Sequence, residues 1–191
     1  MRCYNCHSFT LLGFCEDCIK ELSDLSLGVR KLDDDFKVYS FYKHSEIKHL
    51  LYSKHKFYGY FVLNALAKLS FAKFVDLFSI NFKVNAVALD DRVENFLYSH
   101  SAILTKHLKS KFVKPKFAVL QAQSNIKYSG KNIEFRLKNK RSYKLLKQIS
   151  SPVILVDDVV TSGSSLLEAR NFLKENGIET LFALVLADAK E

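Results

Sequence analysis

The chain has 191 residues, of which 48% are hydrophobic and 26% are charged, and a formal net charge of +9. This composition is typical of a globular protein and excludes a disordered tail, a collagen-like fibre and a disulfide-dense mini-protein. The length allows one domain with a small appendage. With two prolines and six glycines, the chain has no room for a long flexible linker.

All four cysteines lie at the very start of the chain, in two C-x2-C pairs: Cys3, Cys6, Cys15 and Cys18. Four thiolates at this spacing suit tetrahedral Zn²⁺, and a reducing compartment disfavours two disulfides. We expect a closed structural zinc site over a redox site, because a redox motif needs only one pair. So short a segment has no core of its own, so metal binding supplies its folding energy. The predicted domains are a zinc module at residues 1–30 and an α/β unit at 31–191.

The rest of the chain alternates predicted strands and helices, which indicates a parallel α/β sheet. Residues 23–35 are expected to be an acidic connector. The expected strands are 38–42, 85–89, 117–120, 153–156 and 179–187. The expected helices are 45–53 with Ser45 as N-cap, 58–78, 93–111, 131–138 within a basic loop, and 164–176 with Gly177 as C-cap. The polar positions of helix 58–78 gather on no single face, so this helix is either core or a contact surface.

The positive charge is concentrated in the middle of the chain. Residues 1–35 carry a net charge of −3, residues 36–151 carry +16, and residues 152–191 carry −4. The densest part, 106–147, has 13 basic residues against Glu134 alone, with aromatic residues among them. Such a stretch either follows a nucleic-acid backbone while its rings stack on bases, or is simply a lysine-rich solvated surface.

The segment 153–165 (VILVDDVVTSGSS) carries the most chemical information. An apolar strand is expected to end at Asp157 and Asp158, followed by a Thr/Ser/Gly turn and a helix. Backbone N–H groups and hydroxyls of the turn form an anion site at the helix N-terminus. The carboxylates of Asp157 and Asp158 would repel that anion. They are suited instead to bind the hydroxyls of a sugar, either directly or through Mg²⁺. A phosphate beside a diol describes a ribose 5-phosphate, whereas an ordinary βα turn explains only one of the carboxylates.

This segment resembles the 5-phosphoribosyl-1-pyrophosphate (PRPP) signature of type I phosphoribosyltransferases. With the cysteine module, the whole chain is similar to the ComF family of DNA-uptake proteins. The resemblance implies a type I phosphoribosyltransferase fold, a parallel-sheet α/β fold, with a small zinc-ribbon-like module. It also implies a PRPP site whose residues are Asp157, Asp158, Val159, Val160, Thr161, Ser162, Gly163, Ser164 and Ser165.

The second motif of the family matches this chain less closely. Both prolines of its V-P-V-P block are absent from the segment at 84–92. The resemblance places three candidates on the pyrophosphate side, Leu89, Asp90 and Arg92. It also implies a basic hood, with DNA-binding candidates Lys127, Lys131, Arg136, Lys138, Lys140 and Arg141.

The expected function is therefore that of a DNA-uptake factor of natural transformation. It would handle single-stranded DNA in the cytoplasm, including the inner face of the membrane, and bind Mg–PRPP beside a structural Zn²⁺. Other DNA-uptake or recombination proteins are expected partners. The alternative is an active phosphoribosyltransferase with an unidentified acceptor. No stretch approaches the ~20 apolar residues of a membrane span, and the early cysteines leave no room for a signal peptide.

Overall fold

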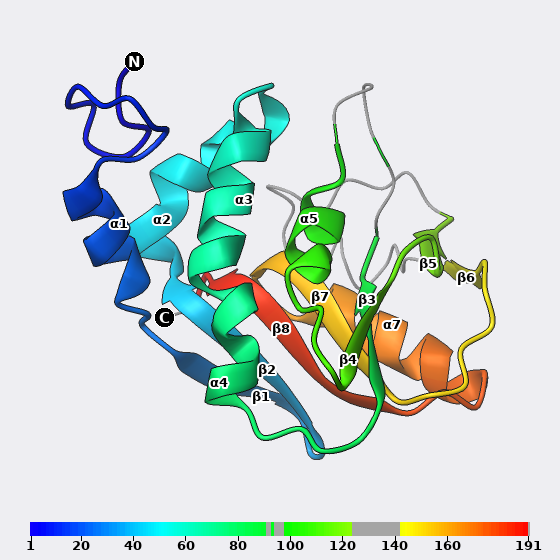
Figure 1. The fold of residues 1–191 in the computed structure, drawn as a ribbon. Helices are drawn as coiled ribbons and strands as arrows, with labels where there is room; N and C mark the ends of the chain where they lie inside the picture. The colour runs from blue at the N-terminus through cyan, green and yellow to red at the C-terminus, as the bar shows by residue number, and fades with distance from the viewer. Residues whose placement is uncertain (91–92, 94–97, 124–141, 191) are drawn as a thin grey trace.

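A mostly parallel six-stranded sheet forms the centre of the structure, a computed structural model that describes residues 1–90, 93, 98–123 and 142–190 (Figure 1). Its strands in spatial order are β1 (Gly28–Asp33), β2 (Phe36–Lys43), β8 (Thr180–Asp188), β7 (Val153–Val160), β3 (Val84–Ala88) and β4 (Val113–Lys116). Only β1 runs antiparallel, as a hairpin with β2. Strands β5 (Leu120–Ala122) and β6 (Tyr143–Leu145) form a separate pair. The predicted parallel α/β class is confirmed at this level.

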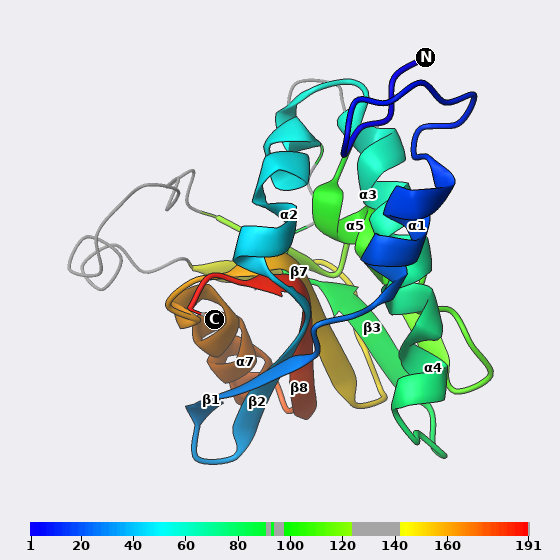
Figure 2. The same cartoon turned by 90° about the vertical axis from the view of Figure 1, so that its left-hand side faces the viewer.

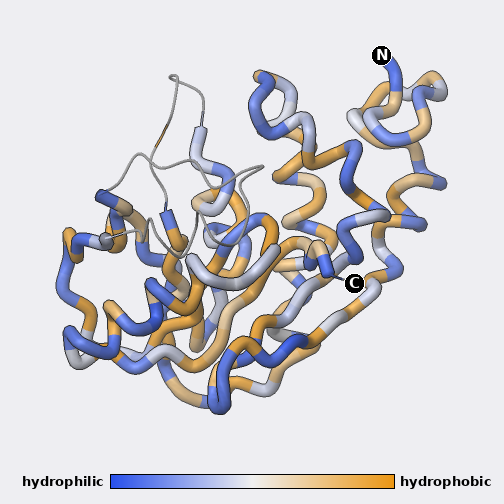
Figure 3. Tube along the Cα trace, turned by 180° about the vertical axis from the view of Figure 1, so that it is seen from behind, coloured by the Kyte–Doolittle hydropathy of each residue, from blue (hydrophilic) through white to orange (hydrophobic). Residues whose placement is uncertain are grey.

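Helices cover both faces of the sheet, as the turned view in Figure 2 shows. One face carries α2 (His44–Leu51), the 3₁₀ turn η1 (Tyr52–His55), α3 (Gly59–Leu69), η2 (Phe71–Lys73), α4 (Phe74–Leu77) and α5 (His100–Lys106). The opposite face carries α7 (Ser164–Glu175). The core is divided accordingly: Ile154 and Val156 of β7 join the cluster under α3, whereas Val153 and Leu155 join the cluster under α7. Strands buried on both faces read as continuous apolar runs, which is why the central strands are coloured hydrophobic in Figure 3.

The strand order reverses between β3 and β7. From β3 the chain continues through α5 to β4 on one side, and from β7 it continues through α7 to β8 on the other. In open α/β sheets such a reversal opens a crevice at the carboxyl ends of the strands, where ligands bind. The motif that follows β7 therefore lies at the place where this architecture accepts a ligand.

The N-terminal module packs against the main unit. Helix α1 (Glu16–Ser23) follows the second cysteine pair, and Phe14 and Leu22 belong to the same buried cluster as the residues of α2 and α3. The Tyr42 hydroxyl donates to the Leu22 carbonyl at 2.6 Å, and the rings of Tyr4 and Tyr58 stack with centroids 5.5 Å apart. The two predicted domains therefore share a core, and β1 crosses the expected boundary at residue 30.

Several predicted elements differ from those observed. The expected helix 58–78 is interrupted at Ser70, whose backbone leaves the helical region. In the described part of the expected helix 93–111, α5 begins after an N-cap at Ser99 and ends at Lys106, whereas residues 94–97 and the expected helix 131–138 lie outside the described residues. Part of the expected connector 23–35 is strand β1, and Ser45 lies inside α2 instead of capping it. The expected strand 117–120 is replaced by β4 and β5 on either side of a turn at Ala118, whose φ is +51°.

Candidate functional site

The four cysteines form one cluster. Their Sγ atoms all lie within 4.8 Å of one another, and the Sγ atoms of Cys6 and Cys15 are 3.6 Å apart. Four converging sulfur ligands fit Zn²⁺, which takes four thiolates in closed structural sites. The predicted grouping of Cys3, Cys6, Cys15 and Cys18 is confirmed, and Zn²⁺ is consistent with the donor set.

Hydrogen bonds to sulfur prepare this cluster for a cation. The backbone N–H of Cys15 donates to the Cys3 Sγ at 3.4 Å, and the Asn5 side chain donates to the Cys18 Sγ at 3.3 Å. Burial opposes ionisation of Cys3, but backbone N–H donors, including those of Cys6 and Cys15, lower its pKa to about 6. Burial and the neighbouring thiols raise the pKa of Cys18 to about 12. A bound cation overcomes this mutual repulsion of the sulfurs.

A pocket of about 550 Å³ opens where β7 ends. One wall is the strand and loop from Asp157 to Ser165, as the sequence predicts. The other wall comes from α2 and η1 and carries four basic side chains: His44, Lys48, Lys54 and His55. The volume suits a small ligand, and the cationic wall suits an anionic one.

The loop between β7 and α7 is shaped by Gly163. Its φ is +83°, in the left-handed region that only glycine adopts without strain, and α7 starts at the next residue. A Cβ atom at this position would lie 2.5 Å from Leu32 Cδ2 of strand β1. The loop therefore turns sharply against the β1–β2 hairpin, and the first residues of α7, Ser164 to Leu166, line the pocket. The first N–H groups of a helix have no partner within the helix and favour an anion.

Arg30 holds the same loop from the side of β1. Its guanidinium makes a two-pronged ion pair with buried Asp188, at 2.7 and 3.0 Å, and donates to the Thr161 carbonyl at 2.9 Å. Because the fork geometry fixes both partners, strand β8 and the loop are tied to one guanidinium. Arg30 is a positioning residue that sequence analysis did not identify.

The acidic pair meets a lysine from the opposite wall. The Lys54 Nζ lies 2.9 Å from Asp158 Oδ2, and both side chains are largely buried, with 30% and 14% exposure. Burial opposes ionisation of both groups. The Lys54 ammonium nevertheless lowers the pKa of Asp158, and the Asp158 carboxylate raises the pKa of Lys54. Both groups are therefore charged at neutral pH.

The carbonyl of Lys54 is held by residues that follow β3. The Tyr98 hydroxyl donates to it at 2.8 Å, and His100 Nε2 donates to it at 2.7 Å. Burial lowers the pKa of His100, and its neutral ring donates through Nε2. Tyr98 and the first residue of α5 thus fix the lysine that faces Asp158.

The carboxylate oxygens of Asp157 and Asp158 are of the type that Mg²⁺ prefers. However, Asp158 is already neutralised by Lys54. The described residues therefore fit Mg²⁺ better as part of an incoming ligand than as a resident ion.

The two other predicted site residues that the structure describes, Leu89 and Asp90, do not line the pocket. Leu89 is buried in the core under α7, and its N–H donates to the Val156 carbonyl. Asp90 follows it at the end of β3, and its carbonyl accepts from Ser101. Arg92 and the six basic candidates between 127 and 141 lie outside the described residues. The strand with the acidic pair is longer than predicted, since β7 continues through Asp157 and Asp158 to Val160.

Lys54 and Arg30 escaped prediction because no local pattern marks them. Lys54 is 104 positions from Asp158, and Arg30 is 158 positions from Asp188. The only feature of the sequence that points to Lys54 is its position in a segment, residues 47–75, that contains no aspartate or glutamate.

Comparison with models of protein families and with curated proteins finds no match to this chain. In the described part of the chain, no helix has both the length and the apolar character needed to cross a membrane.

Proposed function

We propose that this chain is a ComF-like DNA-uptake factor whose pocket binds Mg–PRPP, with single-stranded DNA as its macromolecular partner. The observation that supports it best is the composition of the pocket. A phosphate-type loop at the N-terminus of α7 lies on one side of the acidic pair, and a cationic wall lies on the other.

Each part of the pocket matches one part of the proposed ligand. The loop Thr161–Ser165 offers hydroxyls and N–H groups to a 5-phosphate. Asp157 and Asp158 offer carboxylate acceptors to ribose hydroxyls. Lys48 and Lys54 offer ammonium groups to a pyrophosphate, whose Mg²⁺ neutralises part of its charge.

The decisive experiment is calorimetric titration of Mg–PRPP into the zinc-loaded protein. We expect binding by the wild type and at least about tenfold weaker binding by the double variant Asp157→Asn with Asp158→Asn, because hydrogen bonds to charged groups are lost. Asp76→Asn on α4 is the matched control, since this exposed carboxylate lies away from the pocket. Equal affinity in all three proteins contradicts the proposed site.

The DNA half of the proposal is supported by the charge distribution. The net charge of +16 between residues 36 and 151 predicts an affinity for single-stranded DNA that falls steeply with salt. A flat salt response of an oligonucleotide titration would contradict an electrostatic DNA interface.

A further inference from the structure

The turn between η1 and α3 exposes a group of aromatic rings that the pocket does not use. Phe57 is 76% exposed, Phe61 is 52% exposed and Tyr60 is 42% exposed. A large apolar side chain left in water forgoes the free energy that its burial would provide. Helix α3 therefore has two roles: Val62 and Leu66 build the core, and the rings at its start face solvent.

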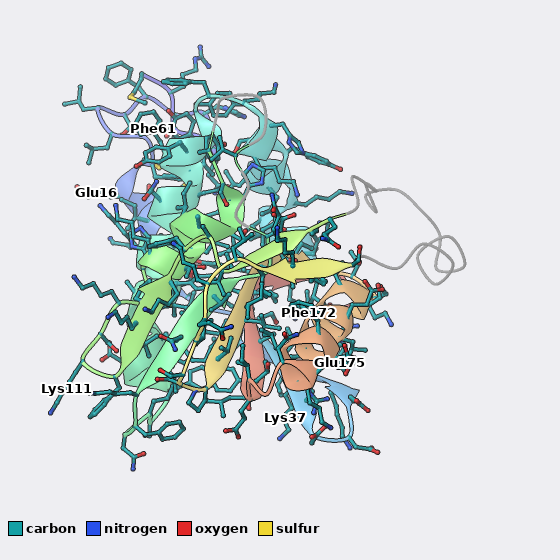
Figure 4. The ribbon with its side chains drawn as sticks, turned by 90° about the vertical axis from the view of Figure 1, so that its right-hand side faces the viewer. Glu16, Lys37, Phe61, Lys111, Phe172 and Glu175 are labelled. Atoms are coloured by element: carbon teal, nitrogen blue, oxygen red, sulfur yellow. The ribbon has the colours of Figure 1, made fainter. Side chains whose placement is uncertain are left out.

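These rings form a continuous path toward the pocket. Successive contacts join Phe57 to Phe61, Phe61 to Tyr60, Tyr60 to Tyr98, Tyr98 to His100 and His100 to His55, with centroid separations of 5.3 to 6.2 Å. His55 also lines the pocket. Phe61 lies at the same end of the molecule as the cysteine module, and Figure 4 shows its position there.

The sequence around the rings is rich in basic side chains. Residues 48–75 contain five lysines and two histidines and no aspartate or glutamate, and residues 1–15 contain no carboxylate either. Lys56 and His55, next to Phe57, are both exposed. The surface therefore combines stackable rings with a neighbouring lysine and histidine.

We infer that this ring surface, made of His55, Lys56, Phe57, Tyr60 and Phe61, binds single-stranded DNA by stacking bases on the rings and pairing phosphates with the cations. The inference rests on the proposed function and gives it an interface within the described residues. Rings and cations together are the features that single-stranded nucleic acids need, and each stacked base contributes substantially to affinity.

Fluorescence anisotropy with a labelled oligodeoxythymidylate tests the surface on the full, zinc-loaded chain. We expect Phe57→Ala and Phe61→Ala each to weaken binding by at least about fivefold, from the loss of stacking. Lys56→Ala is expected to reduce the slope of log affinity against log salt by about 0.7. The matched control is the pair Phe82→Ala and Lys83→Ala, an exposed aromatic–lysine pair that precedes β3 and so lies at the opposite edge of the sheet from the pocket.

A direct probe of stacking is available because the chain contains no tryptophan. Phe57→Trp places a single tryptophan on the surface, and we expect the oligonucleotide to quench its fluorescence, excited selectively at wavelengths that tyrosine does not absorb. Phe82→Trp is the control and is expected to stay unquenched.

Three outcomes overturn the inference. One is unchanged DNA affinity in both ring variants. Another is equal quenching of the two tryptophan variants. The third is a result in which Phe57 and Phe61 are needed for binding to vesicles of anionic phospholipid but not for binding to DNA.

If the wild type binds no DNA, the DNA half of the proposed function fails together with the inference, whereas the Mg–PRPP titration still tests the pocket. If the wild type binds DNA and the ring variants bind equally, only the surface is wrong.

Discussion

At the scale of single residues, the pocket depends on one ion pair between distant parts of the chain. Lys54 neutralises Asp158 in a largely buried setting, and Tyr98 and His100 hold the lysine backbone in place. Removing one partner of such a pair leaves a buried charge without compensation, which costs more than the pair itself contributes. Lys54 therefore stabilises the acidic pair as well as carrying positive charge into the pocket.

Lys54→Met is expected to lower the free energy of unfolding near pH 7 by about 1–3 kcal/mol. The folded pKa of Asp158 is depressed, so the pair's contribution is present above the unfolded pKa of about 4 and is lost as pH falls through the folded value. The folded pKa of Lys54 is raised, so the contribution also disappears as pH rises through that value, above about 10. Urea denaturation over a pH series measures both limits.

The control for this variant is Lys56→Met, which changes an exposed lysine two positions away. We expect it to leave stability nearly unchanged. A loss in Lys54→Met that is as large at pH 3 as at pH 7 would attribute the effect to packing instead of charge.

Gly163→Ala is expected to destabilise the protein and weaken Mg–PRPP binding. The substitution imposes a φ of +83° on alanine and drives its Cβ against Leu32. Gly177→Ala is the matched control, because its φ is +72° but its Cβ would meet nothing within 4 Å. Backbone strain alone costs about 1–2 kcal/mol, so thermal denaturation should show a larger loss for Gly163→Ala. Equal losses would mean that Leu32 moves aside without cost.

At the scale of elements, the β1–β2 hairpin acts as a brace for the β7–α7 loop. Arg170 of α7 pairs with Asp33 at 3.1 Å and Asp35 at 2.5 Å and lies over the Phe36 ring at 4.9 Å from its centroid. Arg30 and Leu32 of β1 reach the loop itself. Asp33 and Asp35, two residues of the expected acidic connector, thus help to dock a strand pair onto a helix.

Arg170→Met is expected to loosen this hairpin without unfolding the sheet. The methionine keeps apolar contact with Phe36 but loses the cation–π contact, worth about 0.5–1 kcal/mol, and the ion pairs. Hydrogen exchange followed by mass spectrometry should show roughly two- to fivefold faster exchange at residues 28–36. Arg170→Ala, which also loses the aliphatic stem, should show a larger effect. Unchanged exchange in both variants would show that the hairpin is held by its sheet pairing alone.

At the scale of the whole molecule, the cysteine module and the α/β unit fold as neighbours in one core. Cys3, Cys18 and Leu22 are buried in the cluster that includes α2 and α3, and His49 of α2 hydrogen-bonds to Asn5 at 2.6 Å. Asn5 in turn donates to the Cys18 sulfur. The four-cysteine cluster is therefore linked to α2 through one asparagine.

Removal of Zn²⁺ by a chelator is expected to lower the melting temperature and to expose more than the module. Metal binding supplies the folding energy of such a short segment, so residues 1–23 should lose their protection from hydrogen exchange. Because the module contacts His49 of α2 and Tyr58 at the start of α3, amides near these two residues should also exchange faster. A chelated protein with an unchanged melting temperature, or with changes confined to residues 1–22, would contradict this coupling.

Elements that depend on residues close together in the chain could be predicted from the sequence, and elements that depend on distant residues could not. The strands around Ile154 and Leu184 were identifiable because burial on both faces leaves an uninterrupted apolar run. Helix ends were less predictable: Ser70 and Ser99 set them through local geometry and a side-chain cap that periodicity does not reveal. Strand β1 was not predicted, because its exposed, charged sequence has no apolar pattern and is held as a strand by pairing with β2.

The sequence by itself determined the metal cluster, the buried strands and the loop after β7, because each depends on residues close together in the chain. Tertiary structure alone decided that Lys54 faces Asp158, that Arg30 ties Asp188 to the loop and that a path of rings runs from Phe57 toward the pocket. These contacts join segments separated by up to 158 positions, and the order of the strands brings them together. No local pattern of residues encodes that order.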